Sequence, residues 1–433
     1  MTRLLSGLAV LSSLTSIQVL ASQAATKQDP IPACEWHPPL LQNVCLNSAS
    51  SPEQSTTKPS PFSKTRSEWA KLGWDGPNDC LPTMPDYCVY TRIPESEPAS
   101  GSPFVVISTA KSMTAIAGST PPFLGKNKKP VSPRDVYTQE FPGKGTGVVA
   151  NRTIKKGEII KAEMPTLLLQ FDMPDNDSKP GAQNGANELS REERLGIYGK
   201  AVERLDEVSK KKFMRQVGGD VVGIVDKNSF RLFVDGDEGH LGVWADVSLF
   251  NHDCRPNTHY RIQNLTHITV AVRDILPGEE LTVSYIEGTI PYAERQERLE
   301  SWGFKCACHA CTQDLSQIAQ SDARLKAITG IEEELEQLVK SGDDFPQDIG
   351  DRLVQLYVDE RLDNYIAHAY TKAALLKSMI GNKKDAIKYA NMAVEALERE
   401  YGPDTKDGDA MRGLAERTEE HWSWGVRMGG WAM

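Results

Sequence analysis

This chain of 433 residues has no excess of positive charge, and it has few long apolar runs. Lys and Arg number 49 against 59 Asp and Glu, so the net charge is −10 and the pI is about 5.5. Nucleic-acid binding relies on basic surfaces that release counterions, so we expect no direct binding to nucleic acid. Beyond the N-terminal segment no apolar run is long enough to cross a bilayer, so we expect no membrane span there.

The N-terminus is the exception to this polar character. Arg3 precedes an apolar stretch from Leu4 to Ala21, and small residues such as Ser22 and Ala24 suit cleavage just after it. The pattern predicts a signal peptide over residues 1–24, and with it a place in the secretory pathway or outside the cell. The alternatives are an uncleaved anchor and the N-terminal helix of a nuclear or cytoplasmic protein.

Residues 25–132 contain an even set of four cysteines. In a secreted protein such a set indicates disulfides, whose connectivity the sequence leaves open. The candidates are Cys34, Cys45, Cys80 and Cys88. The runs "YCVYTRI" and "SPFVVIST" are rich in β-branched and aromatic residues and predict strands. We expect a small N-terminal module followed by a basic, proline-containing linker.

From about residue 133 the pattern changes to strands separated by glycine turns. Ser190 and Glu193 form a capping box that starts a helix, and Gly218–Gly219 ends it, which predicts a helical insert over about 187–219. Strands resume in "SFRLFV", "HITVAV" and "LTVSYI". Residues 315–433 read as helical, and the helix–turn–helix from Ile366 to Pro403 looks like one tetratricopeptide unit.

Three cysteines within six residues, in "FKCACHACTQD", predict a metal site. Structural zinc takes four thiolate or imidazole ligands, so Cys306, Cys308 and Cys311 need a partner. His309 is a poor candidate, because a tight loop cannot easily turn adjacent residues inward together. Apart from the four upstream cysteines, the remaining one is Cys254, in "LFNHDCRPNTHY".

Four motifs follow one another along the chain, and their order is informative: "GKGTGVVA", "LFNHDCRPN", "GEELTVSY" and "WGFKCACHAC". Together they resemble the SET-domain protein-lysine methyltransferases with a post-SET cysteine cluster, above all the SET-and-MYND branch and its fungal relatives. The resemblance covers roughly Val136 to Thr312. It implies a SET domain over 133–288, a post-SET zinc loop over 289–314 and a helical C-terminal domain over 315–433.

The expected fold class is therefore α+β. It combines a SET-domain β-fold, with a helical insert and a post-SET zinc loop, with two flanking parts. An all-α tetratricopeptide-like region comes after it, and the small Cys-containing module precedes it.

The resemblance also implies ligands and roles for particular residues. One structural zinc ion would be held by Cys254, Cys306, Cys308 and Cys311. S-adenosyl-L-methionine would be bound by Lys144, Gly145, Thr146, Asn228, Asn251, His252, Tyr285 and Phe304. Tyr285 would be the catalytic tyrosine that orients the substrate amine.

Two departures from the family pattern bear on activity. No Cys/His-rich insert lies between Phe171 and Leu241, so the MYND zinc module and its partner-peptide site are absent from that segment. The resemblance implies that residue 302 lines the substrate channel, and here it is Trp302, whereas the branch often has a tyrosine at this position.

The predicted function is methyl transfer from S-adenosylmethionine to a lysine of a histone or another protein, by a monomer. The alternative is a non-catalytic SET scaffold that binds proteins. A secretory signal conflicts with a methyl donor made in the cytosol and with zinc thiolates, which favour a reducing compartment. The sequence therefore leaves two compartments open: the secretory pathway or cell exterior, and the nucleus or cytoplasm.

Overall fold

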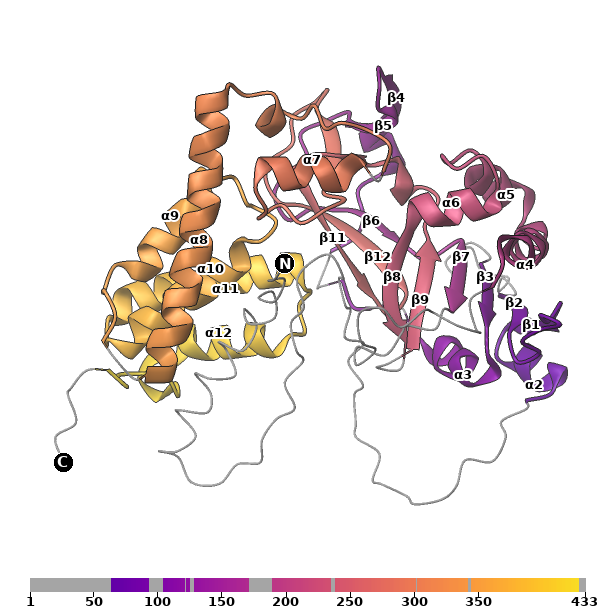
Figure 1. The fold of residues 1–433 in the computed structure, drawn as a ribbon. Coiled ribbons are helices and arrows are strands. Elements are labelled where there is room, and N and C mark those ends of the chain that lie inside the picture. Colours follow the sequence, from indigo (N-terminus) through magenta and orange to yellow (C-terminus); the bar gives the residue numbers. More distant parts are fainter. Residues whose placement is uncertain are drawn as a thin grey trace, which may run out of the picture.

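The computed structural model describes residues 64–92, 104–120, 122–124, 128–170, 189–234, 238–300, 302–341 and 344–427. The predicted signal peptide, Cys34 and Cys45 lie outside these residues. Three β-sheets, a helical insert, a helical C-terminal region and a few separate helices make up the described chain (Figure 1). The predicted α+β fold class is confirmed.

The largest sheet has six strands in the order β1-β2-β3-β7-β9-β8. These strands are β1 (Trp74–Asn78), β2 (Cys88–Arg92), β3 (Val105–Ser108), β7 (Leu167–Gln170), β9 (Glu238–Val243) and β8 (Ser229–Val234). Strand β3 runs parallel to β7, with Val105 opposite Leu167, and the other pairs are antiparallel.

This pairing shows where the described part of the N-terminal module lies. Strands β1 to β3 share one sheet with β7, β8 and β9, so the described part of residues 25–132 is built into the same sheet as later strands. The physical reason is that β3 and most of β7 are buried apolar runs, which need cover on both faces. Helices α2 (Arg66–Lys71) and α3 (Ala110–Gly118) supply Trp69 and Met113 to the same core.

Two smaller sheets hold the sequence motifs. The four-stranded sheet has the order β10-β13-β5-β4, and the three-stranded sheet has the order β11-β12-β6. Their strands are β4 (Val136–Phe141), β5 (Gly145–Ala150), β6 (Ile159–Glu163), β10 (Asn251–His252), β11 (Thr258–Gln263), β12 (Thr266–Ala271) and β13 (Glu280–Val283). Because β10 runs parallel to β13, Asn251 and His252 lie beside the strand that leads to Tyr285.

The helical insert consists of three short helices rather than the single helix predicted. They are α4 (Arg191–Glu203), α5 (Glu207–Met214) and α6 (Val221–Asn228). The predicted capping box of Ser190 and Glu193 is confirmed at the start of α4. Apolar residues of α4, α5 and α6 pack with those of the six-stranded sheet in one core.

Two residues explain why the insert is divided. Asp206 caps α5 by accepting hydrogen bonds from the amides of Val208 and Ser209, and such a cap begins a new helix. Gly218 lies between α5 and α6, where a Cβ atom would stand 2.2 Å from the Ile224 nitrogen. Only glycine allows α6 to begin so close to the preceding turn.

The C-terminal region is helical and lies to one side of the sheets (Figure 1). It contains α8 (Leu315–Ser341), α9 (Ile349–Asp359), α10 (Ile366–Met379), α11 (Lys383–Glu400) and α12 (Lys406–Glu416). Helices α10 and α11 form the predicted helix–turn–helix. The alanines that line their contact are fully buried: Ala369, Ala373, Ala386, Ala390 and Ala393. The tetratricopeptide likeness stays a prediction.

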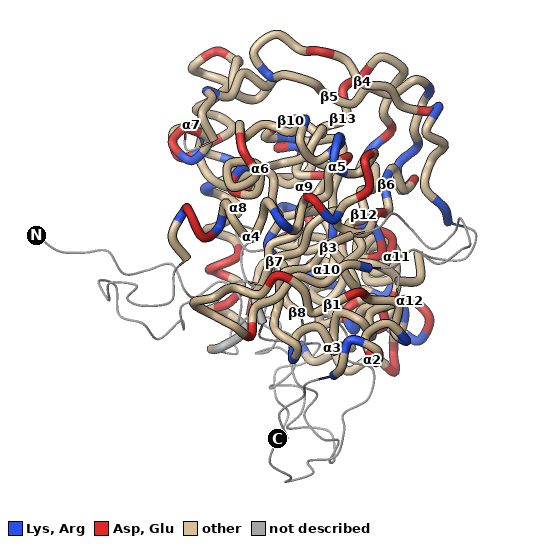
Figure 2. Tube along the Cα trace, turned by 90° about the vertical axis from the view of Figure 1, so that its right-hand side faces the viewer, with Lys and Arg blue, Asp and Glu red and all other residues tan. Residues whose placement is uncertain are grey.

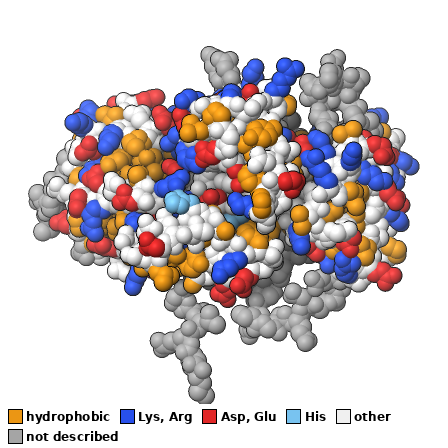
Figure 3. Space-filling model, turned by 90° about the horizontal axis from the view of Figure 1, so that it is seen from above, with side chains coloured by type: hydrophobic (Ala, Val, Ile, Leu, Met, Phe, Trp, Pro, Cys, Tyr) orange, Lys and Arg blue, Asp and Glu red, His pale blue; other side chains and the backbone are white. Residues whose placement is uncertain are grey.

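Charge is distributed without a dominant sign on the faces in view. Along the trace, Lys and Arg positions are interspersed with Asp and Glu positions (Figure 2), and the face seen from above carries the same mixture (Figure 3). Of the described helices, none has the length and apolar character needed to span a membrane.

Candidate functional site

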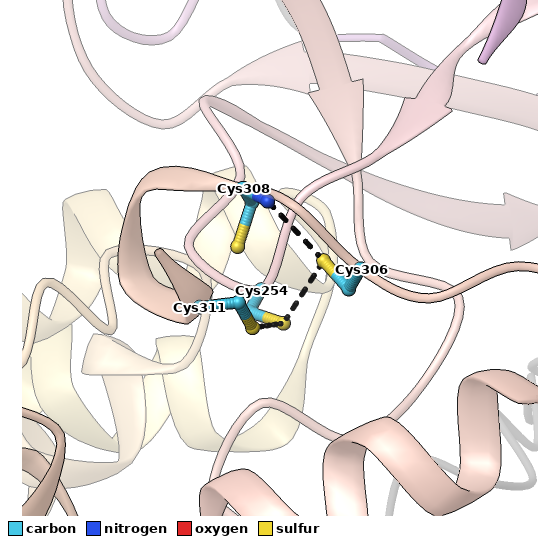
Figure 4. Close-up of side chains that lie close together, drawn as sticks. All are labelled: Cys254, Cys306, Cys308 and Cys311. Carbon is cyan, nitrogen blue, oxygen red and sulfur yellow. Dashed lines mark hydrogen bonds between the residues drawn. The ribbon is translucent and has the colours of Figure 1, made fainter. Parts of the chain in front are cut away.

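The four cysteines of the predicted zinc site converge in the structure (Figure 4). Cys254 follows β10, while Cys306, Cys308 and Cys311 come from the loop after α7 (Tyr292–Glu300). All four sulfur atoms lie within 4.8 Å of one another and are buried. The Cys254 sulfur is 3.9 Å from that of Cys306 and 3.6 Å from that of Cys311.

This arrangement fits zinc. A tetrahedral ion with Zn–S bonds of about 2.3 Å separates its sulfur ligands by about 3.8 Å. The observed separations match that spacing without rearrangement of the backbone, and a closed set of four thiolates is typical of a structural site. His309 is exposed in the same loop and is not part of the cluster.

Two residues next to the cluster were not found from the sequence: Arg295 and Gln296 on α7. The Gln296 amide holds both backbone groups of Cys306, accepting from its N–H at 3.1 Å and donating to its carbonyl at 3.2 Å. Arg295 is fully buried. Although burial opposes its charge, the thiols of Cys254 and Cys311 raise the pKa of Arg295.

Arg295 thus supplies positive charge where four thiolates around a zinc ion leave net negative charge. The only signal for the pair in the sequence is its distance from the cysteines, because Gln296 lies ten residues before Cys306. Their helix reads "YAERQERLE", which is too polar to reveal an inward face.

His252 connects the cysteine cluster to the strand end that carries Tyr285. Its Nδ1 accepts a hydrogen bond from the Tyr285 amide at 3.0 Å, and its Nε2 lies 3.3 Å from the Cys254 sulfur. Burial lowers the pKa of His252 to about 4, so the ring is neutral at physiological pH. With Nδ1 as acceptor, Nε2 carries the proton and donates it to the sulfur. The ring therefore transmits the position of Cys254 to the backbone of Tyr285.

The Tyr285 side chain lies among other aromatic rings. Its ring centroid is 5.0 Å from that of Trp302 and 6.3 Å from that of Phe304. Its hydroxyl donates a hydrogen bond to the carbonyl of Phe250 at 2.8 Å. Burial, with Glu280 as a second cause, raises the pKa of Tyr285 to about 12. The phenol is therefore protonated at neutral pH, and its oxygen remains free to accept a further hydrogen bond.

Glu280, on β13, joins two of the residues predicted to bind the methyl donor. It accepts from the side-chain amide of Asn251 at 2.8 Å and from the Lys144 ammonium at 3.0 Å. A Cβ atom at Gly147 would stand 2.6 Å from the Glu280 carboxylate and 2.8 Å from the Asn251 amide. The glycine after "GKGT" thus allows this contact, and the sequence pattern had assigned no role to Glu280.

The other predicted donor contacts have defined places. Gly145 lies after the β4–β5 turn in the left-handed region (φ 77°), and the Thr146 hydroxyl donates to Glu140. Asn228 ends α6, and its side-chain amide donates to the carbonyls of Val217 and Ile224, each at 2.8 Å. Asn228 therefore links the end of α6 to the segment that precedes this helix.

Phe304 and Trp302 bracket Tyr285 from the post-SET segment. Phe304 packs against the cysteine cluster, and its ring centroid lies 6.1 Å from that of His252. Trp302 is 36% exposed although it contacts the Tyr285 ring. The exposed Trp302 ring thus lies next to the partly buried Tyr285 ring.

A hollow lies where the SET strands, the post-SET loop and the helical region meet. It has a volume of about 380 Å³, and residues such as Asp253, Glu280, His309 and Arg361 line it. Acidic and basic side chains contribute about equally to its wall, so its charge does not identify a ligand.

Comparisons with known proteins match the part of the chain that carries these residues. The SET domain family matches residues 145–286. N-lysine methyltransferase SMYD2-B of Danio rerio is 33% identical over 101 residues, which is 23% of this chain and 23% of that protein. Histone-lysine N-methyltransferase set5 of Schizosaccharomyces pombe is 30% identical over 192 residues, 43% of this chain and 54% of that protein. The alignments with these relatives thus span about a quarter to about half of their lengths.

Among solved structures, the Polycomb Repressive Complex 2 of Chaetomium thermophilum, bound to S-adenosylmethionine, aligns with 65% of this chain and 32% of its own. At 15% identity and a TM-score of 0.18, that overlap is too loose to inform on the fold or its ligands. Residues 145–286 of this chain match the SET domain. SMYD2-B and set5, two of its relatives in sequence, are named lysine methyltransferases, and another relative, from Dictyostelium discoideum, is named a SET and MYND domain-containing protein.

Proposed function

We propose that this chain is an S-adenosylmethionine-dependent protein-lysine N-methyltransferase. One observation carries the proposal: the Tyr285 ring lies beside an exposed aromatic ring, that of Trp302, while the Tyr285 backbone is linked through His252 to the cysteine cluster. A catalytic tyrosine must be held still and yet be reachable from solvent by a lysine side chain. The hydrogen bond to His252 supports the first condition, and the partial burial of Tyr285 beside the exposed Trp302 supports the second.

The residues of the expected donor site suit S-adenosylmethionine. The Lys144 ammonium is partly exposed and offers a charge partner for the carboxylate of the donor. Asn251 is held in place by Glu280, and Phe304 offers a ring on which an adenine can stack. When bound, the donor supplies a methyl group on a sulfonium centre, which needs no metal or redox chemistry for its transfer.

Tyr285 acts in this proposal by orientation rather than as a base. Its hydroxyl proton is engaged by the Phe250 carbonyl, and its pKa of about 12 keeps it protonated. The free lone pair of the oxygen can accept an N–H from the lysine amine and so direct the nitrogen lone pair toward the methyl group. A free lysine amine has a pKa of about 10.4, so the site must take it in the neutral form. Correct orientation of two reactants contributes up to roughly 7–11 kcal/mol to lowering a barrier.

Zinc has a structural role in this proposal. Cys254, Cys306, Cys308 and Cys311 would hold it and so join the strand that carries Asn251 and His252 to the segment that carries Trp302 and Phe304. No open coordination position is left for a substrate when four thiolates bind one tetrahedral ion.

The substrate in this proposal is a lysine of a protein. The set5 relative is named a histone-lysine methyltransferase and the SMYD2 relatives N-lysine methyltransferases, so histones are the first substrates to test. Trp302 lacks the hydroxyl of a tyrosine, and its ring can contact the charged amine by a cation–π interaction.

The test compares the wild-type chain with Tyr285→Phe. Labelled donor is offered with histones and with an array of lysine-containing peptides, and donor affinity is measured by calorimetry. We expect the wild type to transfer methyl groups and the variant to lose on the order of 10² in rate while donor affinity stays nearly constant. Tyr137→Phe is the matched control, because Tyr137 is exposed on β4.

The two remaining outcomes each contradict part of the proposal. Equal rates in wild type and Tyr285→Phe would show that the phenol only fills space. If the wild type binds the donor but transfers no methyl group to any lysine, the proposed methyltransferase activity is refuted. A protein-binding SET scaffold is then favoured.

A further inference from the structure

Arg255 comes directly after the zinc-ligand candidate Cys254 and is buried at the boundary with the helical region. Its guanidinium donates to four acceptors at once. Nη1 reaches the Cys254 carbonyl at 2.6 Å and the Gly288 carbonyl at 2.8 Å. Nε reaches the Glu360 carbonyl at 2.7 Å, and Nη2 pairs with the Glu360 carboxylate. One side chain thus joins the cysteine cluster, the segment after Tyr285 and the end of α9.

Glu360, at the C-terminus of α9, is buried as deeply as its partner. Its carboxylate also accepts from the Ser321 hydroxyl and, at 2.8 Å, from Nε of Arg324, both on α8. A buried carboxylate needs such a full set of donors, because an unpaired charge there is strongly destabilising. The network therefore extends from Arg255 into two helices of the C-terminal region.

Gly288 is held from the other side as well. Its amide donates to the Tyr365 hydroxyl at 3.3 Å, and a Cβ atom at this position would stand 3.1 Å from the Tyr365 ring. The backbone three residues after Tyr285 thus lies between Arg255 and Tyr365. It has little freedom to move unless the helical region moves with it.

Two further side chains of the same SET segment contact the end of α11. His259 donates from Nε2 to the carbonyl of Glu400, 3.1 Å away, and Arg261 donates to the carbonyl of Arg399 at 2.9 Å. The last carbonyls of a helix lack partners within the helix and carry partial negative charge. Side chains of residues 255–261 therefore donate hydrogen bonds to carbonyls at the C-termini of both α9 and α11.

We propose that Arg255 is a positioning residue: through Gly288 and Cys254 it makes the helical region determine the position of Tyr285. The proposal rests on the methyl transfer proposed above, because Tyr285 matters only there. It goes further in giving the helical region a part in turnover, in addition to any part in substrate binding. If Arg255 only joined the two regions without positioning Tyr285, its replacement would lower the stability of the fold and leave turnover unchanged.

The test variant is Arg255→Met combined with Glu360→Met. It removes both buried charges together, and such apolar replacements are often tolerated. We measure zinc content, donor affinity, turnover and hydrogen exchange of peptides that cover residues 285–291. Arg66→Met is the control, because Arg66 forms an exposed ion pair with Asp75.

We expect the variant to keep its zinc and its donor affinity. Hydrogen exchange over 285–291 should rise, and kcat should fall on the order of tenfold or more, because small misplacements of a reacting group have large effects on rate. If the double variant does not fold, Arg255→Lys is measured in the same way, since a lysine cannot serve all four acceptors.

A lower melting temperature with unchanged exchange and unchanged kcat would overturn the proposal and leave Arg255 a structural brace. If the wild type transfers no methyl groups, the exchange measurement still decides whether Arg255 holds the segment after Tyr285. Failure of the proposed function and failure of this inference are thus distinguishable.

Discussion

Cysteines hold the described chain together in two places, and the two differ in reach. Cys80 and Cys88 form a disulfide across eight positions of sequence, at the turn that leads into β2. Cys254 meets Cys306 and Cys311 across 52 and 57 positions. The disulfide stabilises one local turn, whereas the cluster brings remote segments to a common point.

The difference shows in the surroundings that each group supports. The disulfide adjoins the core of the six-stranded sheet through the buried Cys88. The cluster adjoins His252, Tyr285 and Phe304, which belong to the proposed active site. Loss of the disulfide should therefore affect stability alone, and loss of the cluster should affect function.

The largest effect is expected from Cys254→Ser. A serine hydroxyl is a poor zinc ligand, so zinc measured by elemental analysis should fall from one ion per chain to nearly none. Thiolate–zinc binding contributes roughly 10–16 kcal/mol to small zinc modules. Without it the post-SET segment should separate from β10, and donor affinity in calorimetry should be lost.

The control for this experiment is Cys80→Ser, which breaks the Cys80–Cys88 disulfide but leaves the four cluster cysteines unchanged and should keep the zinc. Full zinc occupancy in Cys254→Ser would show that the metal, if present, is held by another set of residues.

A smaller effect is expected when both Cys80 and Cys88 are replaced by alanine. A closed loop of this length restricts the unfolded chain by an entropy worth about 2.5 kcal/mol. The free energy of unfolding, measured with denaturant under non-reducing conditions, should fall by about that amount. Zinc content and donor affinity should stay as they are, and a loss of either would contradict the division of roles between the two cysteine groups.

Much of the candidate site could be predicted because its residues are constrained by chemistry. Cys306, Cys308 and Cys311 need a fourth ligand, and one cysteine in the chain stood inside a motif that suggested it. Strands such as β12 and β13 were also predictable, since their β-branched residues leave a local pattern. Each of these signals lies within a few residues of sequence or in a familiar spacing.

The features that were missed depend on contacts between distant parts of the chain. The pairing of β3 with β7 joins residues about sixty positions apart, and neither strand shows its partner in its own sequence. Glu280 reads as one acid in "GEEL", and its contacts with Asn251 and Lys144 appear only when three segments meet. The same holds for Arg255 and Glu360, which are ordinary charged residues until burial pairs them.

A third connection between distant segments, the contact between β11 and α11, involves no cysteine. Glu400, at the end of α11, is completely buried, and its Oε1 accepts from the Ala367 amide at 3.1 Å. Its Oε2 makes no hydrogen bond within the described residues. Burial raises the pKa of Glu400 to about 8 from its ordinary 4.5, although the nearby charges of Arg399 and Lys156 oppose the rise.

The sign of the pH effect comes from this shift. Between pH 4.5 and about 8 the folded chain holds a proton on Glu400 that the unfolded chain has released. Stability from this group is therefore fully present below pH 4.5 and is lost as the pH rises through about 8. The disulfide has no proton to release in this range, so it should not contribute to the slope.

The last expected effect is the removal of this pH dependence by Glu400→Gln. Glutamine keeps an acceptor for the Ala367 amide but cannot ionise, so the stability of the variant should decline less than that of the wild type over this range. Melting temperatures of both proteins at pH 5, 6.5 and 8.5 give the comparison, and Glu419→Gln is the control because Glu419 forms an exposed ion pair. Parallel pH profiles for wild type and Glu400→Gln would show that Glu400 is ionised in the fold, and that Arg399 and Lys156 outweigh its burial.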